Sequence, residues 1–155
     1  MRVFASRKPS MTDYPSPVLA TEDIPPVAVD SMNATHKEEV ELINQLGELL
    51  RAAADGTPDD AAISAQLKAW LEHTRAHFER ENRLMREYAF PPYGVHAAEH
   101  ANVLAELETL RDLWEQNHNP EPLTRYVFDR WPAWFDRHVN SMDKVTAQFL
   151  SQFIS

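Results

Sequence analysis

Three short breaks rich in proline or glycine divide most of this chain into segments that are long enough for helices. The breaks lie at residues 55–58, 89–94 and 119–122. Proline removes a backbone donor and restricts the residue before it, so each break is a strong helix stop signal. The chain has only three glycines, which disfavours a turn-rich β architecture. The pattern predicts four helices whose short connections make sequential helices antiparallel neighbours.

The predicted helices cover residues 35–54, 59–88, 95–117 and 123–149, and the last has a kink or a fresh start at Pro132. Residues 1–32 contain Pro15, Pro17, Pro25 and Pro26 and predict an extended, proline-rich N-terminal arm. The expected fold class is all-α: an up-down-up-down four-helix bundle over residues 33–155, preceded by that arm.

Composition excludes several classes of function. The net charge is −9, so nucleic acid and anionic membrane surfaces are not expected partners. The absence of cysteine excludes disulfides, thiolate metal sites and Fe–S clusters. No apolar run approaches the roughly 18 residues of a membrane span, and no signal peptide is recognised, so we expect a cytoplasmic location without membrane insertion.

Each predicted helix has a stripe of apolar residues that faces the core, and this stripe is interrupted by polar residues. Every helix places a histidine where a bundle core calls for an apolar residue, and two acids lie beside them. Burying such groups unpaired costs several kcal/mol each, against a total stability of about 10 kcal/mol, so something must pair them. The simplest explanation is one metal cluster formed by His36, His77, Glu81, His96, His100, His138 and Asp143.

The spacings agree with this interpretation in two helices and are less favourable in the last. His77 and Glu81 lie four residues apart and share a helix face, as do His96 and His100. Asp143 follows its histidine by five residues, so either a distortion of the helix or a side chain that reaches around it must close the gap.

Imidazole and carboxylate without sulfur suit iron, zinc, copper or nickel. Five histidines and two carboxylates are too many for one ion, whereas two ions bridged by the carboxylates use them all. Three histidines on one ion and two on the other leave a position for a small ligand.

Four stretches resemble the hemerythrin family, and specifically the bacterial hemerythrins. They are NATHK at 33–37, HFERENRLM at 77–85, YAFPPYGVHAAEH at 88–100 and WFDRHVNSMDK at 134–144. The resemblance spans about residues 30–150. It implies two iron ions, one held by His96, His100 and His138, the other by His36 and His77, with Glu81 and Asp143 as bridges.

The resemblance also implies reversible dioxygen binding at the iron with two histidines, for oxygen storage, delivery to an oxygen-consuming enzyme, or sensing. Oxygen carriers of the family usually have leucine where this chain has Phe135, whereas Trp134 matches the family pattern. We expect both side chains to line the ligand pocket. The bulkier Phe135 is expected to alter oxygen affinity and autoxidation.

Other functions and architectures remain open at this stage. The same ligands could form a di-iron enzyme that scavenges peroxide or nitric oxide. No ionisable side chain besides the predicted ligands lies clearly on an inner stripe, which favours a binding protein over an enzyme. Glu38, Glu39 and Glu41 are interpreted as a solvated face, and His73 as an outer-shell or solvated residue. Ferritin-like sites need two Glu-x-x-His pairs, and the zinc-protease motif His-Glu-x-x-His is absent.

Overall fold

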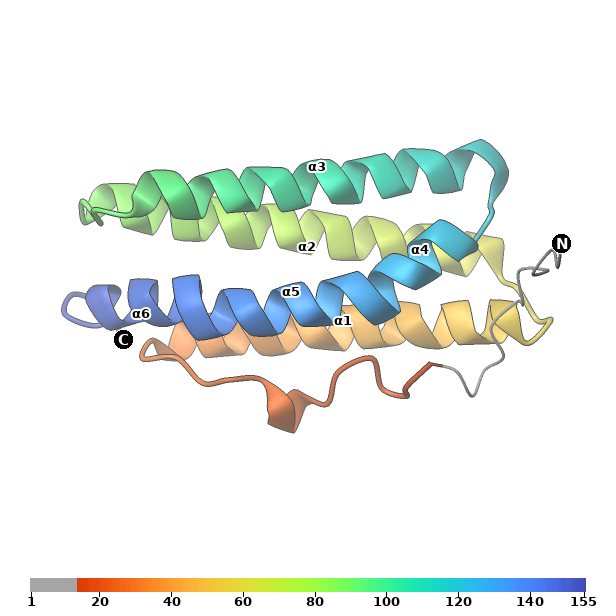
Figure 1. The fold of residues 1–155 in the computed structure, drawn as a ribbon, viewed down its shortest axis with the longest axis horizontal. Helices are drawn as coiled ribbons and strands as arrows, with labels where there is room; N and C mark the ends of the chain where they lie inside the picture. The colour runs from red at the N-terminus through yellow and green to blue at the C-terminus, as the bar shows by residue number, and fades with distance from the viewer. Residues whose placement is uncertain (1–13) are drawn as a thin grey trace, which may run out of the picture.

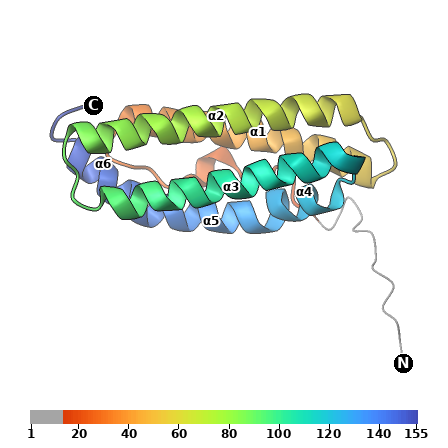
Figure 2. The same ribbon diagram turned by 90° about the horizontal axis from the view of Figure 1, so that it is seen from above.

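Four long helical segments run up-down-up-down in residues 14–155, the part of the chain that this computed structural model describes (Figure 1). They are α1 (Asp30–Ala54), α2 (Asp60–Glu87), α3 (Tyr93–Asn117) and a composite fourth helix. The fourth consists of α4 (Glu121–Arg125), η3 (Tyr126–Arg130), α5 (Trp131–His138), η4 (Val139–Asp143) and α6 (Lys144–Leu150). In Figure 2, α1 lies behind α2 and the fourth helix lies behind α3. The predicted four-helix bundle is confirmed.

The first helix begins five residues earlier than its predicted start, at Asp30 rather than Thr35. Met32, which lies in this additional turn, is buried against Ala147 and Leu150 of α6. Contact with a distant helix therefore stabilises a turn for which the local sequence gives only a weak signal.

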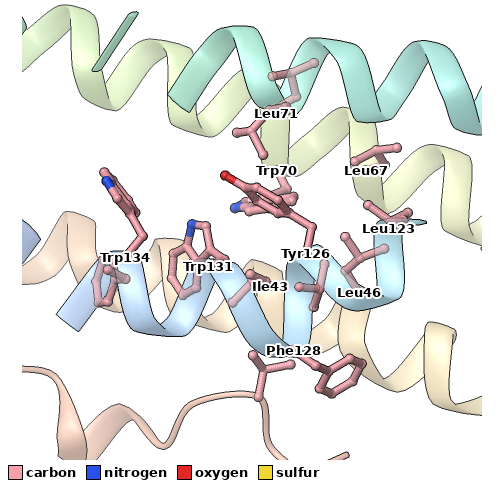
Figure 3. Packing of buried hydrophobic residues seen from close by; sticks show 14 of the residues in the cluster. Ile43, Leu46, Leu67, Trp70, Leu71, Leu123, Tyr126, Phe128, Trp131 and Trp134 are labelled. Carbon is pink, nitrogen blue, oxygen red and sulfur yellow. The ribbon is translucent and has the colours of Figure 1, made fainter. Parts of the chain in front are cut away.

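Two hydrophobic clusters fill the bundle. The larger one occupies most of its length and includes Trp70, Trp131 and Ile43, which point toward one another in Figure 3. The smaller one lies at the end where α1 begins and α6 ends. Burial of each large apolar side chain stabilises the fold by about 1.5–3 kcal/mol. His36 falls between the two clusters along α1, so the polar level of the bundle has apolar packing on both sides.

The described part of the N-terminal arm runs along α1 and includes the short 3-10 helix η2 (Thr21–Asp23) (Figure 1). Two asparagines of α1 hold it. Asn44 accepts a hydrogen bond from the Leu19 amide and donates one to its carbonyl, at 3.0 and 2.8 Å. Asn33 makes the same pair of bonds with Val27, both at 2.9 Å. Residues 1–13 of the predicted arm lie outside the described residues.

The fourth helix contains two π-helical turns, η3 and η4. In η3 the amide of Trp131 bonds to the carbonyl of Tyr126, five residues back. Pro132 follows in the first turn of α5, and Arg130 and Trp131 before it keep right-handed helical backbone angles. The chain therefore stays helical across Pro132 and does not begin a separate helix there. No helix in residues 14–155 is both long and apolar enough to cross a bilayer.

Candidate metal centre

All seven predicted ligands meet inside the bundle, at the polar level between the two hydrophobic clusters. Each is buried, with at most 4% of its surface exposed. They come from all four segments of the bundle, so no single helix forms the site. Their donor atoms form two groups in which every atom lies within 4.8 Å of the others. One group contains Glu81, His96, His100, His138 and Asp143, and the second contains His36, His77 and Glu81.

The two carboxylates lie at the middle of the cluster, and every histidine directs its Nε2 atom toward them. Glu81 lies 2.6 Å from Nε2 of His77 and 3.5 Å from Nε2 of His100. Asp143 lies 3.1 Å from Nε2 of His36 and 3.2 Å from Nε2 of His138. Each acid therefore contacts histidines of both groups, which is the arrangement a bridging carboxylate requires.

The distortion needed to bring Asp143 to the site is the second π turn, η4, which begins directly after His138. In a π turn the hydrogen bond spans five residues, so side chains five apart share a face. His138 and Asp143 consequently reach the same cluster despite their unfavourable spacing.

The same turn changes which residues face the core beyond it. An inward stripe continued from His138 at α-helical spacing would include Met142, Val145 and Phe149. That prediction is wrong beyond η4, since Val145 is 56% exposed and Thr146 is fully buried instead. The extra residue of the π turn rotates the rest of the helix by about one position.

Several buried polar atoms of the cluster have no hydrogen-bond partner among the described residues. They are both ring nitrogens of His36, Nδ1 of His77, Oε1 of Glu81, Nε2 of His100 and Oδ1 of Asp143. Some lie within ion-pair distance of a neighbour but lack the orientation of a hydrogen bond. Buried polar atoms are rarely left unpaired. Their donor types and convergence fit metal ions held between the Nε2 atoms and the carboxylates.

The electrostatics of the metal-free cluster act differently on its donors. Burial alone would lower the pKa of His77 and His138, but Glu81 beside His77 and Asp143 beside His138 raise it above the usual value, so protons compete with a metal at these two rings. Burial, together with the nearby imidazoles of His96 and His138, lowers the pKa of His100 to about 2, so its ring stays neutral. Burial alone would raise the pKa of Asp143, but contacts with His138, His36 and His96 hold it well below its usual value. Neutral imidazole and ionised carboxylate are the metal-binding states of these groups.

Three of the histidines are oriented by a partner on the ring nitrogen that faces away from the cluster. Nδ1 of His96 lies 2.8 Å from the Thr146 hydroxyl, and Nδ1 of His100 lies 2.8 Å from Oδ1 of Asn82. Nδ1 of His138 lies 3.2 Å from a carboxylate oxygen of Glu99. Such outer partners fix the tautomer of metal-binding histidines.

The sequence interpretation missed Glu39. It was placed on a solvated face, yet it is only 2% exposed and contacts four side chains of α2. The inference that no further ionisable residue lies inside the bundle is therefore wrong. Glu39 lies three residues after His36, one turn along the same helix, and this spacing was the available signal. His73, interpreted from the sequence as an outer-shell or solvated residue, contacts Glu39 and Glu38 and is partly exposed.

Of the two predicted pocket residues, Phe135 lies beside His36, with ring centroids 5.7 Å apart and planes at 88°. Trp134 instead stacks on His138 at 4.6 Å and donates a hydrogen bond from Nε1 to Glu99 at 2.9 Å. Phe135 thus lies on the two-histidine side of the cluster, and Trp134 supports the three-histidine side.

A helical bundle with a buried cluster of histidines and carboxylates from every helix defines a metal-binding bundle protein. Residues 27–150 match the family model described as the hemerythrin HHE cation binding domain, and the chain therefore belongs to the hemerythrin family.

Similar proteins support this assignment. The chain is 34% identical over 119 residues to a bacteriohemerythrin of Aquifex aeolicus (strain VF5), covering 77% of this chain and 87% of the relative. It is 36% identical over 104 residues to a bacteriohemerythrin of Ralstonia nicotianae, covering 67% and 73%. Crystal structures of hemerythrin variants with single leucine substitutions share its fold, with a TM-score of 0.69 at 24% identity, covering 81% of this chain and 90% of theirs.

Proposed function

We propose that the chain holds two iron ions and binds dioxygen reversibly. His96, His100 and His138 would hold one ion, and His36 and His77 the other, with Glu81 and Asp143 between them. When bound, the iron pair would supply the two electrons that capture of dioxygen requires. The chain itself orients the donors, excludes water and limits what can reach the ions.

The observation that carries this proposal is the division of the cluster into three- and two-histidine groups. Glu81 belongs to both groups, and Asp143 of the first group also lies 3.1 Å from Nε2 of His36. Seven protein donors exceed what one ion accommodates, and the absence of cysteine leaves a purely imidazole and carboxylate set, which suits iron. The ion with fewer protein donors is the one with room for an added ligand.

The surroundings of the two-histidine group favour a very small ligand. A cavity of about 20 Å³ lies against His77 and Glu81. This volume corresponds to roughly one water-sized molecule. Arg80 and Thr35 also line this cavity, whereas Phe135 packs against the ring of His36 outside the cavity lining. A diatomic gas fits these limits, and a larger organic substrate does not.

The test is to load the protein with iron, reduce it without oxygen, and then admit dioxygen while recording the visible spectrum. Reversible binding predicts a charge-transfer band that grows with dioxygen pressure and fades under vacuum over repeated cycles. Irreversible oxidation in the first cycle would contradict the proposal. A preparation that retains no iron would remove its basis.

A second candidate is a di-iron enzyme that scavenges peroxide or nitric oxide, and one observation favours it. The buried Glu39 lies 3.9 Å from Nδ1 of His77, so an ionisable group does lie next to the two-histidine half. Steady catalytic consumption of peroxide or nitric oxide by the iron-loaded protein, together with irreversible oxidation by dioxygen, would favour this function over the first.

A further inference from the structure

Glu39 is a buried carboxylate that no predicted ligand role explains. It projects from α1, one turn after His36, and is 2% exposed. Its Oε1 atom accepts hydrogen bonds from Nε1 of Trp70 at 3.1 Å and from the hydroxyl of Thr74 at 2.5 Å. Both donors are on α2, so this oxygen is fixed from two directions.

The other oxygen of Glu39 faces two imidazoles. Oε2 contacts Nδ1 of His73 and lies 3.9 Å from Nδ1 of His77. His73 is partly exposed, and its second nitrogen lies 3.2 Å from the exposed Glu38. Nδ1 of His77 has no hydrogen-bond partner among the described residues, and Glu39 is a carboxylate within ion-pair distance of it.

The contact between Glu39 and Nδ1 of His77 resembles the contacts that orient the histidines of the three-histidine group. There, His96, His100 and His138 each have an acceptor within 3.2 Å of Nδ1, and Nε2 points into the cluster. His77 has the same polarity, with Nε2 toward Glu81 and Nδ1 toward Glu39. The remaining distance of 3.9 Å is short enough for a small rotation of the ring to close.

We propose that Glu39 is the positioning residue for His77: it holds the tautomer whose Nδ1 carries the proton and whose Nε2 lone pair is free for the metal. The inference rests on the proposed function only in requiring that His77 binds a metal. His73 contacts Oε2 of Glu39, the same oxygen that lies near His77. Trp70 and Thr74 keep the carboxylate from turning away.

The charge state of Glu39 suits this role. Burial would raise its pKa, but the imidazoles of His73 and His77 and the hydroxyl of Thr74 outweigh it and lower the pKa to about 2. A carboxylate that stays ionised at neutral pH accepts hydrogen bonds only, and thus favours an N–H on each facing nitrogen.

The experiment is an anaerobic titration of the metal-free protein with cobalt(II), followed by its visible ligand-field spectrum. In Glu39→Gln the amide can still accept from Trp70 and Thr74, but its NH₂ group then faces Nδ1 and opposes the required tautomer. We expect one of the two bound ions to weaken by about 10–100-fold, as loss of such partners usually causes, and its spectrum to change. Glu41→Gln, an exposed position on the same helix, should match the wild type.

Two further measurements make the result decisive. Glu99→Gln removes the corresponding acceptor of His138, and should weaken the other ion. Thermal unfolding of each metal-free variant measures any purely structural effect. Unchanged cobalt affinities in Glu39→Gln would overturn the proposal, even if the metal-free variant unfolds at a lower temperature. Because cobalt binding does not involve dioxygen, a wild type that binds two ions but no dioxygen reversibly would contradict the proposed function alone.

Discussion

At the scale of single residues, the buried polar groups of this protein are concentrated around the metal cluster. Among residues 14–155, every buried polar residue other than Thr124 is a predicted ligand or lies beside the ligands. Thr146 contacts His96, and Glu39 accepts a hydrogen bond from Thr74 and lies near His77. Thr35 accepts a hydrogen bond from Arg80, which lines the cavity at His77 and Glu81. Distributed through the core, such groups would each cost several kcal/mol. Gathered at one level, they can be satisfied together by metal ions.

Phe135 provides a prediction for the ligand pocket. Replacing Phe135 by leucine removes the ring edge beside His36 and opens space on the two-histidine side. We expect the rate of irreversible oxidation, or the dioxygen affinity, to change several-fold, measured by stopped-flow absorbance of the reduced iron protein. Phe149→Leu, in a different aromatic group near the end of α6, is the control and should behave like the wild type. Identical kinetics for Phe135→Leu would place the ring outside the ligand's path.

Tyr126 provides a prediction about pH, away from the metal. It is buried, its hydroxyl donates to Glu106 at 3.1 Å, and burial together with Glu106 raises its pKa above the ordinary value of 10.0. The pKa of Tyr126 is higher in the folded protein than in the unfolded chain. The stabilisation from its hydrogen bond to Glu106 is therefore present below pH 10 and is lost as the pH rises above 10.

The measurement compares urea unfolding of metal-free wild type and Tyr126→Phe between pH 7 and pH 11. At neutral pH the wild type should be more stable by about 0.5–1.5 kcal/mol, the contribution of one hydrogen bond. Above pH 10 this advantage should shrink by up to about 1.4 kcal/mol per pH unit. A difference that stays constant across the range would mean that Tyr126 ionises equally in both states.

At the scale of helices, the π turn η4 acts as one extra residue in the fourth helix. It brings Asp143 into line with His138 and rotates everything beyond it, so that Thr146 and Leu150 face inward. The consequence is a change of register that α-helical periodicity alone does not predict.

Deletion of Ser141 tests this role of η4. Ser141 is exposed within η4. Its removal should convert the turn to α geometry, and the spacing between His138 and the aspartate would fall from five residues to four, which keeps both on one face. We expect a cooperative thermal transition with wild-type helix content by circular dichroism. Deletion of Glu79, an exposed residue in the regular part of α2, should rotate Glu81 and the rest of α2 by about 100° relative to His77 and abolish cooperative unfolding. Equal damage from both deletions would argue against the extra-residue interpretation.

The contact between the arm and α1 depends on Gly47. A Cβ atom there would lie 2.4 Å from Cγ2 of Val18 and 3.3 Å from Cζ of Phe128. Gly47→Ala should therefore displace the arm and lower the free energy of unfolding by about 1–3 kcal/mol, with faster hydrogen exchange at the Leu19 amide. In Gly94→Ala the added Cβ meets nothing within 4 Å. This variant should leave hydrogen exchange at Leu19 unchanged, and its free energy of unfolding should be unchanged or slightly higher. Protection of Leu19 at the wild-type level in Gly47→Ala would show that the arm adapts in place.

At the scale of the whole molecule, the metal cluster joins all four helices and is expected to couple metal binding to global stability. The metal-free protein keeps unpaired donors in its interior, and a ligand that binds only the folded state stabilises it by mass action. Removal of the metal by a chelator should lower the midpoint of thermal unfolding. If the free ion had been at 1,000 times its dissociation constant, the free energy of unfolding should fall by about 4 kcal/mol.

This difference should disappear in acid. Metal binding requires neutral imidazole and ionised carboxylate, so protons compete with the metal as the pH falls below the ordinary histidine pKa of about 6.5. Differential scanning calorimetry of loaded and metal-free protein between pH 8 and pH 4 measures the effect. Equal midpoints at neutral pH would mean that the cluster does not hold a metal tightly.

The four helices, the breaks between them and the residues of the cluster could be predicted from the sequence. These features depend on local rules: proline and glycine end helices, and pairs such as His77 with Glu81 or His96 with His100, four residues apart, share a helix face. The burial of Glu39, the earlier start of α1 at Asp30 and the register beyond η4 became evident only in the folded structure. Each of these depends on contacts between segments distant in the chain, such as Glu39 with Trp70 or Met32 with Leu150. Periodicity within one helix carries no information about such contacts, because they depend on how the helices pack against one another.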